Sequence, residues 1–269
     1  MSAKIVVCGA AGRMGRLIVG LVGESAQCVL AGAVESEGHP ALGRDAGETA
    51  GGSAAGVMIT SDYATVAAPD TVTLDFTTAA AAMAHLRAAA EAGAGIVIGT
   101  TGFTPAEAKE ARALADRTRT IIAANMSVGV NVLLKLVADA ASLLGPGFDP
   151  EISEIHHRMK VDSPSGTALA LARALAAPLG RDLAQSRVSA REGLIGKRRE
   201  DEIGVMALRG GDVVGDHTVY FLGDGERVEL SHRAQSRECL ARGAVRAGIW
   251  LATQTEPGLY TMADVLGLT

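Results

Sequence analysis

The glycine-rich turn near the N-terminus is the feature that most constrains the fold. Residues 4–8 (KIVVC) are a short apolar, β-branched run, which is typical of a buried parallel strand. This run leads directly into GAAGRMG at residues 9–15, and a helical pattern follows at residues 16–22. In this context, glycines let backbone N–H groups approach a pyrophosphate at the start of a helix. The spacing is G-x-x-G-x-x-G, so a simple tight turn is the alternative, but the flanking elements favour a dinucleotide site.

Strands and helices alternate through the rest of the first half of the chain. Apolar runs predict strands at residues 29–34, 71–76, 95–98 and 120–123, and helical patterns cover residues 79–92 and 104–117. Residues 36–60 are rich in glycine, alanine and polar side chains, which predicts a loop with short elements. The alternation indicates an α/β fold with a Rossmann-type, doubly wound parallel sheet over residues 1–127.

Small or polar residues stand at the end of each predicted strand, with the aromatic Phe76 among them: Gly9, Glu35, Phe76, Thr77, Gly99, Thr100, Thr101, Ala123 and Asn125. Ligands of doubly wound sheets bind at this carboxyl edge. Glu35 lies about 20 residues past the glycine turn, where an acidic side chain accepts from the ribose hydroxyls of NAD. The next residue is Ser36 and the first cation after it is Arg44, which favours NADH over NADPH, although Arg13 could partly hold a 2′-phosphate. A solvated loop acid is the alternative for Glu35.

The second half of the chain has a different pattern of predicted elements. A long helix at residues 128–144 ends at a Gly-Pro-Gly turn, and a strand at 151–155 and a helix at 168–179 follow. Strand-like runs at residues 185–191, 203–209, 217–222 and 227–232 then come without long helices between them. They predict a second α+β domain with an open mixed sheet over residues 128–237. Helices at residues 236–253 and 261–266 predict that residues 238–269 return to the dinucleotide-binding domain.

The stretch EIHHRMKVDSPSGT, residues 154–167, concentrates the chemistry of this second domain. His156 and His157 can donate protons near neutral pH, and Lys160 among cationic neighbours can do the same. The Pro-Ser-Gly-Thr turn opens a helix whose first N–H groups and dipole favour a carboxylate or phosphate. Taken singly, each histidine is an ordinary strand-end residue and Lys160 a surface charge. Together, beside a helix start, they indicate proton transfer to a small acid.

Composition excludes several classes of protein. A net charge of −5 argues against nucleic acid as the main partner, and 48% hydrophobic with 20% charged residues is typical of a globular protein. The apolar residues 79–95 are interrupted by charges, and the N-terminus has no signal-peptide layout, so we expect no membrane partner and a cytoplasmic location. The three cysteines lack metal-ligand spacing, so we expect free thiols and no metal. His217 and His232 are interpreted as sheet residues.

The chain resembles the 4-hydroxy-tetrahydrodipicolinate (dihydrodipicolinate) reductase family over nearly its whole length. The matching stretches are GAAGRMG (9–15), DFT (75–77), VIGTTGF (97–103), AANMSVGVN (123–131), EIHHRMKVDSPSGTA (154–168), VGDHTVYF (214–221), GERVELSHRA (225–234) and MADVL (262–266). The E-x-H-H-R-x-K-x-D-x-P-S-G-T string is highly specific by itself. Two departures are small: Ser36 stands where many NADPH-using relatives carry Arg, and Met126 replaces the Phe common after the Asn.

The resemblance implies NAD(P)H-dependent reduction of a cyclic unsaturated dicarboxylate in the diaminopimelate pathway of lysine biosynthesis. It implies a homotetramer joined through the middle-domain sheets. Carried over by position, His156 and Lys160 are the general acids, and His157, Gly166 and Thr167 contact substrate carboxylates. The implied cofactor contacts are Gly9, Ala10, Ala11, Gly12, Arg13, Met14, Glu35, Phe76, Gly99, Thr100, Thr101, Ala123, Ala124, Asn125 and Met126.

Two other functions fit the same patterns less well. One is another Rossmann oxidoreductase, acting on an amino acid or a hydroxy acid. The other is a nucleotide-sensing regulator that kept the cofactor fold and lost catalysis, which an intact His156 and Lys160 pair disfavours.

Overall fold

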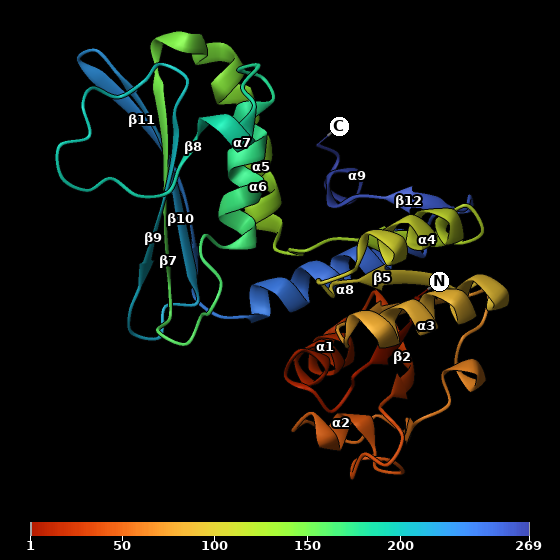
Figure 1. The fold of residues 1–269 in the computed structure, drawn as a ribbon. Helices are drawn as coiled ribbons and strands as arrows, with labels where there is room; N and C mark the ends of the chain where they lie inside the picture. Colours follow the sequence, from red (N-terminus) through yellow and green to blue (C-terminus); the bar gives the residue numbers. More distant parts are fainter. Residues whose placement is uncertain (1, 269) are drawn as a thin grey trace. The chain divides into compact units, whose positions relative to one another are not determined.

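The chain divides into two compact units, each with its own sheet. The computed structural model describes residues 2–268. The first unit comprises Met1–Val128 and Glu238–Thr269, and the second comprises Gly129–Arg237 (Figure 1). The first unit is therefore built from both ends of the sequence, and the second is a continuous insertion.

The first unit contains a parallel sheet of seven strands within residues 2–268, in the order β12-β6-β5-β4-β1-β2-β3. Its strands are β1 (Ala3–Cys8), β2 (Cys28–Val34), β3 (Ile59–Thr60), β4 (Thr71–Asp75), β5 (Gly95–Ile98), β6 (Arg119–Ile122) and β12 (Gly258–Tyr260). Its helices are α1 (Arg13–Glu24), α2 (Ala46–Thr49), α3 (Ala79–Ala92), α4 (Pro105–Ala115), α8 (Glu238–Leu251) and α9 (Met262–Leu266), with a 3-10 turn η1 (Tyr63–Thr65).

Helices cover both faces of this sheet, so its strands are apolar on both sides. Val72 and Leu74 of β4 pack with α1 and α8 residues in one buried cluster. Val6 and Cys8 of β1 instead pack with Leu86 of α3 in a second cluster on the opposite face. Continuous apolar runs are what a parallel sheet between two helix layers requires. The central strands consequently hold their carboxyl ends in fixed register.

The second unit has a mixed sheet covered by helices on one face (Figure 1). The strand order is β11-β10-β7-β9-β8, where β7 pairs antiparallel with β10 and parallel with β9. The strands are β7 (Asp149–His156), β8 (Arg187–Val188), β9 (Ile203–Arg209), β10 (Gly215–Gly223) and β11 (Glu226–Ala234). The helices are α5 (Val128–Leu144), α6 (Gly166–Ala176) and α7 (Leu183–Ser186), with a 3-10 turn η2 (Gly145–Gly147).

Side chains of β7 alternate strictly between buried and half-buried positions. Ile152 packs with Leu133 and Val137 of α5 and with Leu171 of α6 in the core of the second unit. Because side chains of a strand alternate between faces, Glu154 and His156 point to the same covered side as Ile152. The functional stretch therefore begins inside the core and not on the surface.

The helix at Val128–Gly147 is long and apolar enough, by length and composition, to cross a membrane. It supplies Leu133, Val137 and Ala141 to the core of the second unit. Its exposed side carries an ion pair between Lys135 and Asp139. Apolar and polar faces of this kind belong to a helix packed on one side of a folded unit.

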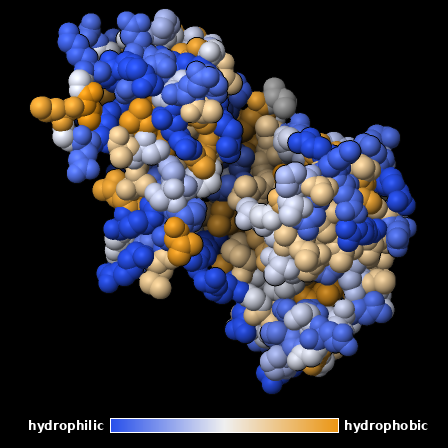
Figure 2. Space-filling view, in the orientation of Figure 1, coloured by the Kyte–Doolittle hydropathy of each residue, from blue (hydrophilic) through white to orange (hydrophobic). Residues whose placement is uncertain are grey.

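Large apolar side chains that reach the surface are mixed with polar ones. On the face drawn in Figure 2, hydrophobic residues lie among hydrophilic neighbours. The most exposed are Leu194, Val161 and Leu143. Scattered apolar residues of this kind are normal for a protein surface.

The fold class that the sequence predicts is confirmed, and three local predictions need correction. In the segment 185–191, predicted as a strand, residues 185–186 end α7, residues 187–188 form the two-residue strand β8, and residues 189–191 are in neither a helix nor a strand. Asp182 caps α7 by accepting from the Ala184 N–H, which favours the helical turn at this point. Strand β12 was missed because it is only three residues long and is defined by pairing with β6. Strand β3, inside the predicted loop, was missed for the same reason.

Candidate functional site

The glycine turn after β1 is held tightly against the start of α1. Gly9 has a φ of 72° and its carbonyl accepts from the Gly12 N–H at 2.9 Å. A side chain at Gly15 would place its Cβ 2.0 Å from the Gly9 oxygen, so only glycine fits there. Ala10 and Ala11 are buried, with exposures of 1% and 8%, and their N–H groups already donate to the Val34 carbonyl and to Glu35 Oε2.

The N-terminus of α1 has no side-chain cap. Its N-cap residue is Gly12, and no side-chain hydrogen bond closes the first turn. Orphan N–H groups at a helix start, next to a loop that a Cβ would fill, form a cradle for a pyrophosphate. The residues present thus fit a dinucleotide. Arg13 and Met14 begin this helix, with Arg13 exposed and Met14 half-buried.

Glu35 follows the end of β2 beside the glycine turn. Its Oε2 accepts from the Ala11 N–H and its Oε1 from the Ser36 N–H, both at 3.1 Å. Glu35 is half-buried, and these two backbone donors hold its carboxylate beside the glycine turn. Its position next to the turn suits acceptance from ribose hydroxyls.

The ends of β4 and β5 interlock. A Cβ on Gly99 would meet the Phe76 ring at 2.2 Å, so the aromatic ring lies directly on this glycine. The Thr100 Oγ1 donates to the Thr77 carbonyl at 3.3 Å, and the Gly99 N–H donates to the Asp75 carbonyl at 2.9 Å. Thr101 is exposed in the loop that follows. Phe76, Gly99 and Thr100 thus form one contact group at the strand ends.

The end of β6 contributes residues 123–126. The Ala123 N–H donates to the Ile98 carbonyl, and the Asn125 Oδ1 accepts from the Ser127 N–H at 2.9 Å. Ala124 is exposed, whereas Met126 is only 1% exposed as a whole residue and lies in the core with α8. Met126 therefore offers a ligand almost no surface in this structure.

The parallel sheet brings all of these predicted cofactor contacts to one edge. The strands that end at them are neighbours in the order β6-β5-β4-β1-β2. Because parallel strands share a direction, the residues after them lie at the same carboxyl edge, where doubly wound folds bind nucleotides.

In the second unit, Glu154 is the centre of a buried charged network. Its side chain is fully buried and accepts two bonds from the Arg209 guanidinium, at 2.8 and 2.9 Å. It also accepts from His156 Nδ1 at 2.5 Å and from the Ser165 N–H at 3.0 Å. Burial alone raises the pKa of Glu154, but these donors outweigh it and hold the pKa below its ordinary value. The carboxylate therefore stays charged and orients three groups at once.

His156 is held with its Nδ1 toward Glu154 and its Nε2 toward Gly215. A Cβ on Gly215 would lie 3.0 Å from Nε2, so this glycine leaves room for the ring. Because the carboxylate can only accept, Nδ1 carries a proton and Nε2 is the atom that exchanges one. Burial lowers the pKa of His156, and the bond to Glu154 offsets only part of this effect. A bound dianion would favour the protonated ring.

The N-terminus of α6 lies on the same network. Ser165 is its N-cap: its Oγ accepts from the Ala168 N–H, and His217 Nε2 lies 3.1 Å from the same oxygen. His217 is buried, its ring stands edge-on to the His156 ring at 5.1 Å, and burial lowers its pKa to about 4. Space within 4 Å of a Cβ built on Gly166 is empty, so a carboxylate could approach the helix start there. Thr167, the next residue, is half-buried.

His157 and Lys160 lie at the surface of this network. The His157 N–H donates to the Val213 carbonyl at 2.7 Å, and the Lys160 N–H donates to the His157 carbonyl at 3.1 Å. The Lys160 ammonium lies 2.8 Å from Asp162, a counter-charge that the sequence reasoning did not consider. The predicted proton donors and anion-binding residues of this unit thus come from one strand end and one helix start.

Sequence reasoning missed the residues that hold this site together. Arg209 and His217 come from β9 and β10, and nothing in their local sequence links them to Glu154 or Ser165. His217 lies in the sheet as predicted, but its ring also reaches the cap of α6. The Ser-Gly-Thr helix start was the one signal that pointed to Ser165.

The first unit has a doubly wound sheet and an uncapped helix after a glycine turn. The inserted unit carries histidine and lysine beside a helix start that a ligand can approach. Together these features define the class of two-domain, nicotinamide-dependent oxidoreductases. Comparisons with known proteins narrow this class. Residues 3–126 match the family model for the N-terminus of dihydrodipicolinate reductase, and residues 129–266 match the model for its C-terminus. The chain therefore belongs to the dihydrodipicolinate reductase family.

Curated relatives match over almost the full chain. The 4-hydroxy-tetrahydrodipicolinate reductase of Syntrophobacter fumaroxidans is 52% identical over 98% of this chain and 99% of its own length. The reductase of the same name from Anaeromyxobacter dehalogenans strain 2CP-1 is 53% identical over 98% of both chains. The protein is accordingly an NAD(P)H-dependent oxidoreductase of the diaminopimelate route to lysine, as the sequence predicts.

Solved structures show the same fold. A dipicolinate-bound dihydrodipicolinate reductase from Paenisporosarcina sp. TG-14 matches with a TM-score of 0.76, at 23% identity over 98% of this chain and 99% of that chain. A myo-inositol dehydrogenase from Lactobacillus casei, solved with NAD(H) and myo-inositol, matches with a TM-score of 0.60 at 12% identity over 100% of this chain and 91% of that chain. At such identities, the likeness is one of fold alone.

Proposed function

We propose that the protein reduces 4-hydroxy-tetrahydrodipicolinate to tetrahydrodipicolinate, with His156 and Lys160 as proton donors. The observation that carries this proposal is the Glu154 network: one buried carboxylate accepts hydrogen bonds from His156 and from Ser165 at the start of α6, and so orients both. A relative bound to the planar dicarboxylate dipicolinate supports the substrate class. The full-length likeness to the curated reductases supports the reaction.

Binding and protonation are the parts that this chain performs. When bound, the reduced nicotinamide supplies the hydride. The N-terminus of α6, with the Gly166 N–H and the Thr167 hydroxyl, receives one carboxylate, and His157 contacts the dianion. In the net reaction the 4-hydroxyl group of the substrate leaves as water, the ring gains one hydride, and one proton is taken up. His156 and Lys160 act together as the source of that single proton, a contribution of roughly 10²–10⁴-fold when such a donor is positioned.

The proposed cofactor contacts are Gly9–Met14, Glu35, Phe76, Gly99–Thr101 and Ala123–Met126. The uncapped α1 start and the cradle at Gly15 support the pyrophosphate position. Ser36 supplies no positive charge beside Glu35, so we propose that NADH binds at least as well as NADPH.

We further propose a homotetramer joined through the sheets of the second unit, in the cytoplasm. The face of β7 opposite the helices carries Ile155, and neighbouring β9 carries Leu208, which is 51% exposed. A sheet face without helices is a surface that a second copy can cover. The free, buried Cys8 and Cys28 agree with a reducing compartment. Light scattering after size exclusion tests the assembly, and a monomer at micromolar concentration would contradict it.

Loss of absorbance at the nicotinamide band tests the reaction. The full-length protein with NADH should turn over freshly made dihydrodipicolinate precursor and should leave amino acids and hydroxy acids untouched. Pyridine-2,6-dicarboxylate should inhibit by competing with the precursor. Turnover of an amino or hydroxy acid instead would favour the alternative dehydrogenase, and NADH binding without any turnover would favour a nucleotide sensor.

A further inference from the structure

Asp75 is a fully buried carboxylate at the end of β4, outside the set of proposed cofactor contacts. Its side chain points to the face of the sheet covered by α3, next to the buried Cys8. A charge without water is costly unless hydrogen bonds replace the lost hydration. Three donors do so here: the Thr77 N–H at 2.9 Å, the Thr77 Oγ1 at 2.6 Å and His85 Nδ1 at 2.6 Å.

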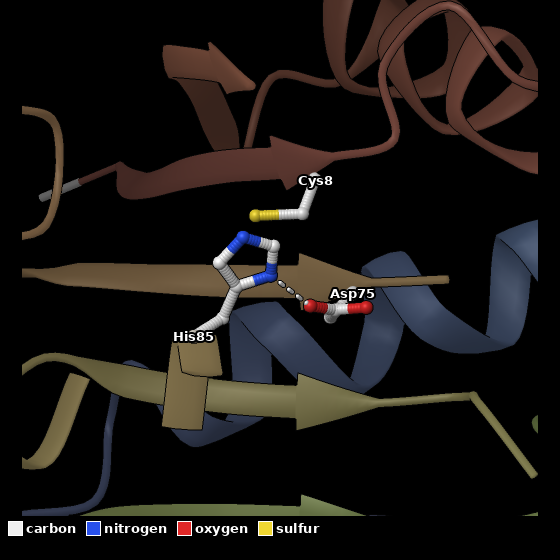
Figure 3. A group of neighbouring side chains, drawn as sticks. All are labelled: Cys8, Asp75 and His85. Carbon is white, nitrogen blue, oxygen red and sulfur yellow. Dashed lines mark hydrogen bonds and ion pairs between the residues drawn. The ribbon is translucent and has the colours of Figure 1, made fainter. Parts of the chain in front are cut away.

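Figure 3 shows how the three side chains of this cluster lie: the His85 ring comes from α3 and stands between the Asp75 carboxylate and the Cys8 sulfur. Their possible metal-ligand atoms are all within 4.8 Å of one another. The His85 to Asp75 distance of 2.6 Å, however, is that of a hydrogen bond. Two ligands on one tetrahedral Zn²⁺ stand roughly 3.3 Å apart. Burial, followed by the charge of Asp75, raises the pKa of Cys8, so it remains a neutral thiol. The cluster is built as a hydrogen-bonded pair beside a thiol and not as a metal centre.

Thr77 is the residue that this pair holds in place. Its carbonyl accepts from the Thr100 Oγ1, which ties the end of β4 to the end of β5. Its methyl group lies where a Cβ on Gly9 would come within 3.1 Å, so it also packs on the glycine turn after β1. A shift of Thr77 would therefore move three of the segments that line the carboxyl edge of the sheet.

We propose that His85 is a positioning residue for the nicotinamide half of the cofactor site, acting through Asp75 on Thr77 and Thr100. This inference rests on the proposed cofactor contacts. The sheet topology indicates which half of the cofactor lies near His85. β2 and Glu35, which are proposed to bind the adenosine ribose, lie on one side of β1, and β4 and β5 lie on the other side, where the nicotinamide half is expected. His85 touches no ligand itself. It holds the Asp75 carboxylate, and that carboxylate holds Thr77, which links the loops that follow β4 and β5.

The test compares four single variants and one double variant of the full-length protein by calorimetry with NADH and with ADP-ribose, which lacks the nicotinamide. His85→Leu removes the donor, His85→Asn keeps an amide donor near the Nδ1 position, and Thr77→Val removes the Oγ1 donor. Arg87→Ala is the matched control, because Arg87 lies on the same helix and forms an exposed ion pair with Glu110.

His85→Leu should raise the Kd for NADH about tenfold, equivalent to about 1.4 kcal/mol, and the Kd for ADP-ribose less than about threefold. His85→Asn should restore most of the NADH affinity, and Arg87→Ala should change neither Kd. KM for NADH should rise with kcat nearly constant, because positioning of the cofactor and not the proton donors is altered. A double variant of His85→Leu and Thr77→Val should show less than the sum of the two single effects.

Equal weakening of NADH and ADP-ribose in His85→Leu, or no rescue by His85→Asn, would reduce His85 to a structural role and overturn the proposal. If His85→Leu does not fold, Thr77→Val decides: an unchanged NADH affinity in that variant would contradict the proposed coupling, and selective weakening of NADH would support it. Calorimetry needs no substrate. A wild-type protein that binds NADH but does not reduce 4-hydroxy-tetrahydrodipicolinate would therefore disprove the proposed reaction and leave this inference standing.

Discussion

Two helix N-termini in this protein are suited to anions, and they are built in different ways. α1 has Gly12 as its N-cap residue and no side-chain cap, and its backbone is packed so tightly that a Cβ at Gly15 would lie 2.0 Å from the Gly9 oxygen. α6 has Ser165 as its N-cap residue; the Ser165 side chain caps the helix, and the Ser165 N–H donates to the buried Glu154. One site excludes side chains, and the other is held by them.

The difference follows from what each site is proposed to do. A pyrophosphate needs backbone N–H groups at close range and no proton transfer, which a glycine turn provides at any pH. A site that protonates a bound dicarboxylate needs side chains with defined tautomer and orientation. The Glu154, Arg209, His156 and His217 group supplies that orientation. The second site should therefore be sensitive to pH and to changes of side-chain charge, and the first to changes of backbone shape.

The largest expected effect separates chemistry from cofactor binding. Lys160→Ala should lower kcat about 10²–10⁴-fold, because a positioned proton donor is lost. The Kd for NADH, measured by calorimetry, should stay within about twofold, since no group of the glycine turn changes. Lys135→Ala is the control, because this lysine forms an exposed pair with Asp139 on α5. An unchanged turnover number would remove Lys160 from the proposed mechanism.

The next effect probes the backbone cradle. Gly15→Ala should weaken NADH binding about 100-fold, roughly 2.7 kcal/mol, because the added methyl group has to displace the Gly9 carbonyl. Gly20→Ala in the same helix has nothing within 4 Å of the new methyl group. It should leave the Kd unchanged and stabilise the helix by up to about 1 kcal/mol. Equal affinities of the two variants in calorimetry would show that close approach at Gly15 is not required.

The third effect concerns the pH dependence of stability in the second unit. His217 has a pKa of about 4 when folded, against 6.5 when unfolded. Between these values the unfolded chain binds a proton that the folded chain does not, so the free energy of unfolding falls as pH decreases from 6.5 to 4, by up to ~3 kcal/mol. Amide hydrogen exchange of α6 at several pH values measures this loss. The slope should be smaller in His217→Gln, and identical slopes in both proteins would contradict the assignment.

The smallest effect concerns the choice of coenzyme at the backbone site. NADH should bind at least as well as NADPH in wild type, because Ser36 brings no cation to a 2′-phosphate. Ser36→Arg should strengthen NADPH binding about tenfold, the gain expected of one charge-assisted contact. Competition calorimetry with both coenzymes checks the ratio. A tenfold or greater preference of wild type for NADPH would mean that another cation, such as Arg13, binds the phosphate.

Elements with a strong local pattern were predictable, and short ones were not. The glycine turn, the helix start at residues 104–107 with its capping box, and the HHRMK stretch could be located from residue type and spacing alone. Strands β3 and β8 have two residues each, and β12 has three. Strands of that length are defined by their partners, because so few residues carry no periodicity of their own.

The sequence by itself determined the alternation of the longer strands and helices, the dinucleotide turn and the presence of proton donors beside a helix start. Hydrophobic periodicity, glycine spacing and capping residues are local properties, and they act over a few residues. Only the tertiary structure decided that Arg209 of β9 and His217 of β10 reach Glu154 and Ser165, and that His85 of α3 reaches Asp75. A buried carboxylate must find donors wherever the packed chain brings them, and sheet pairing joins residues far apart in sequence.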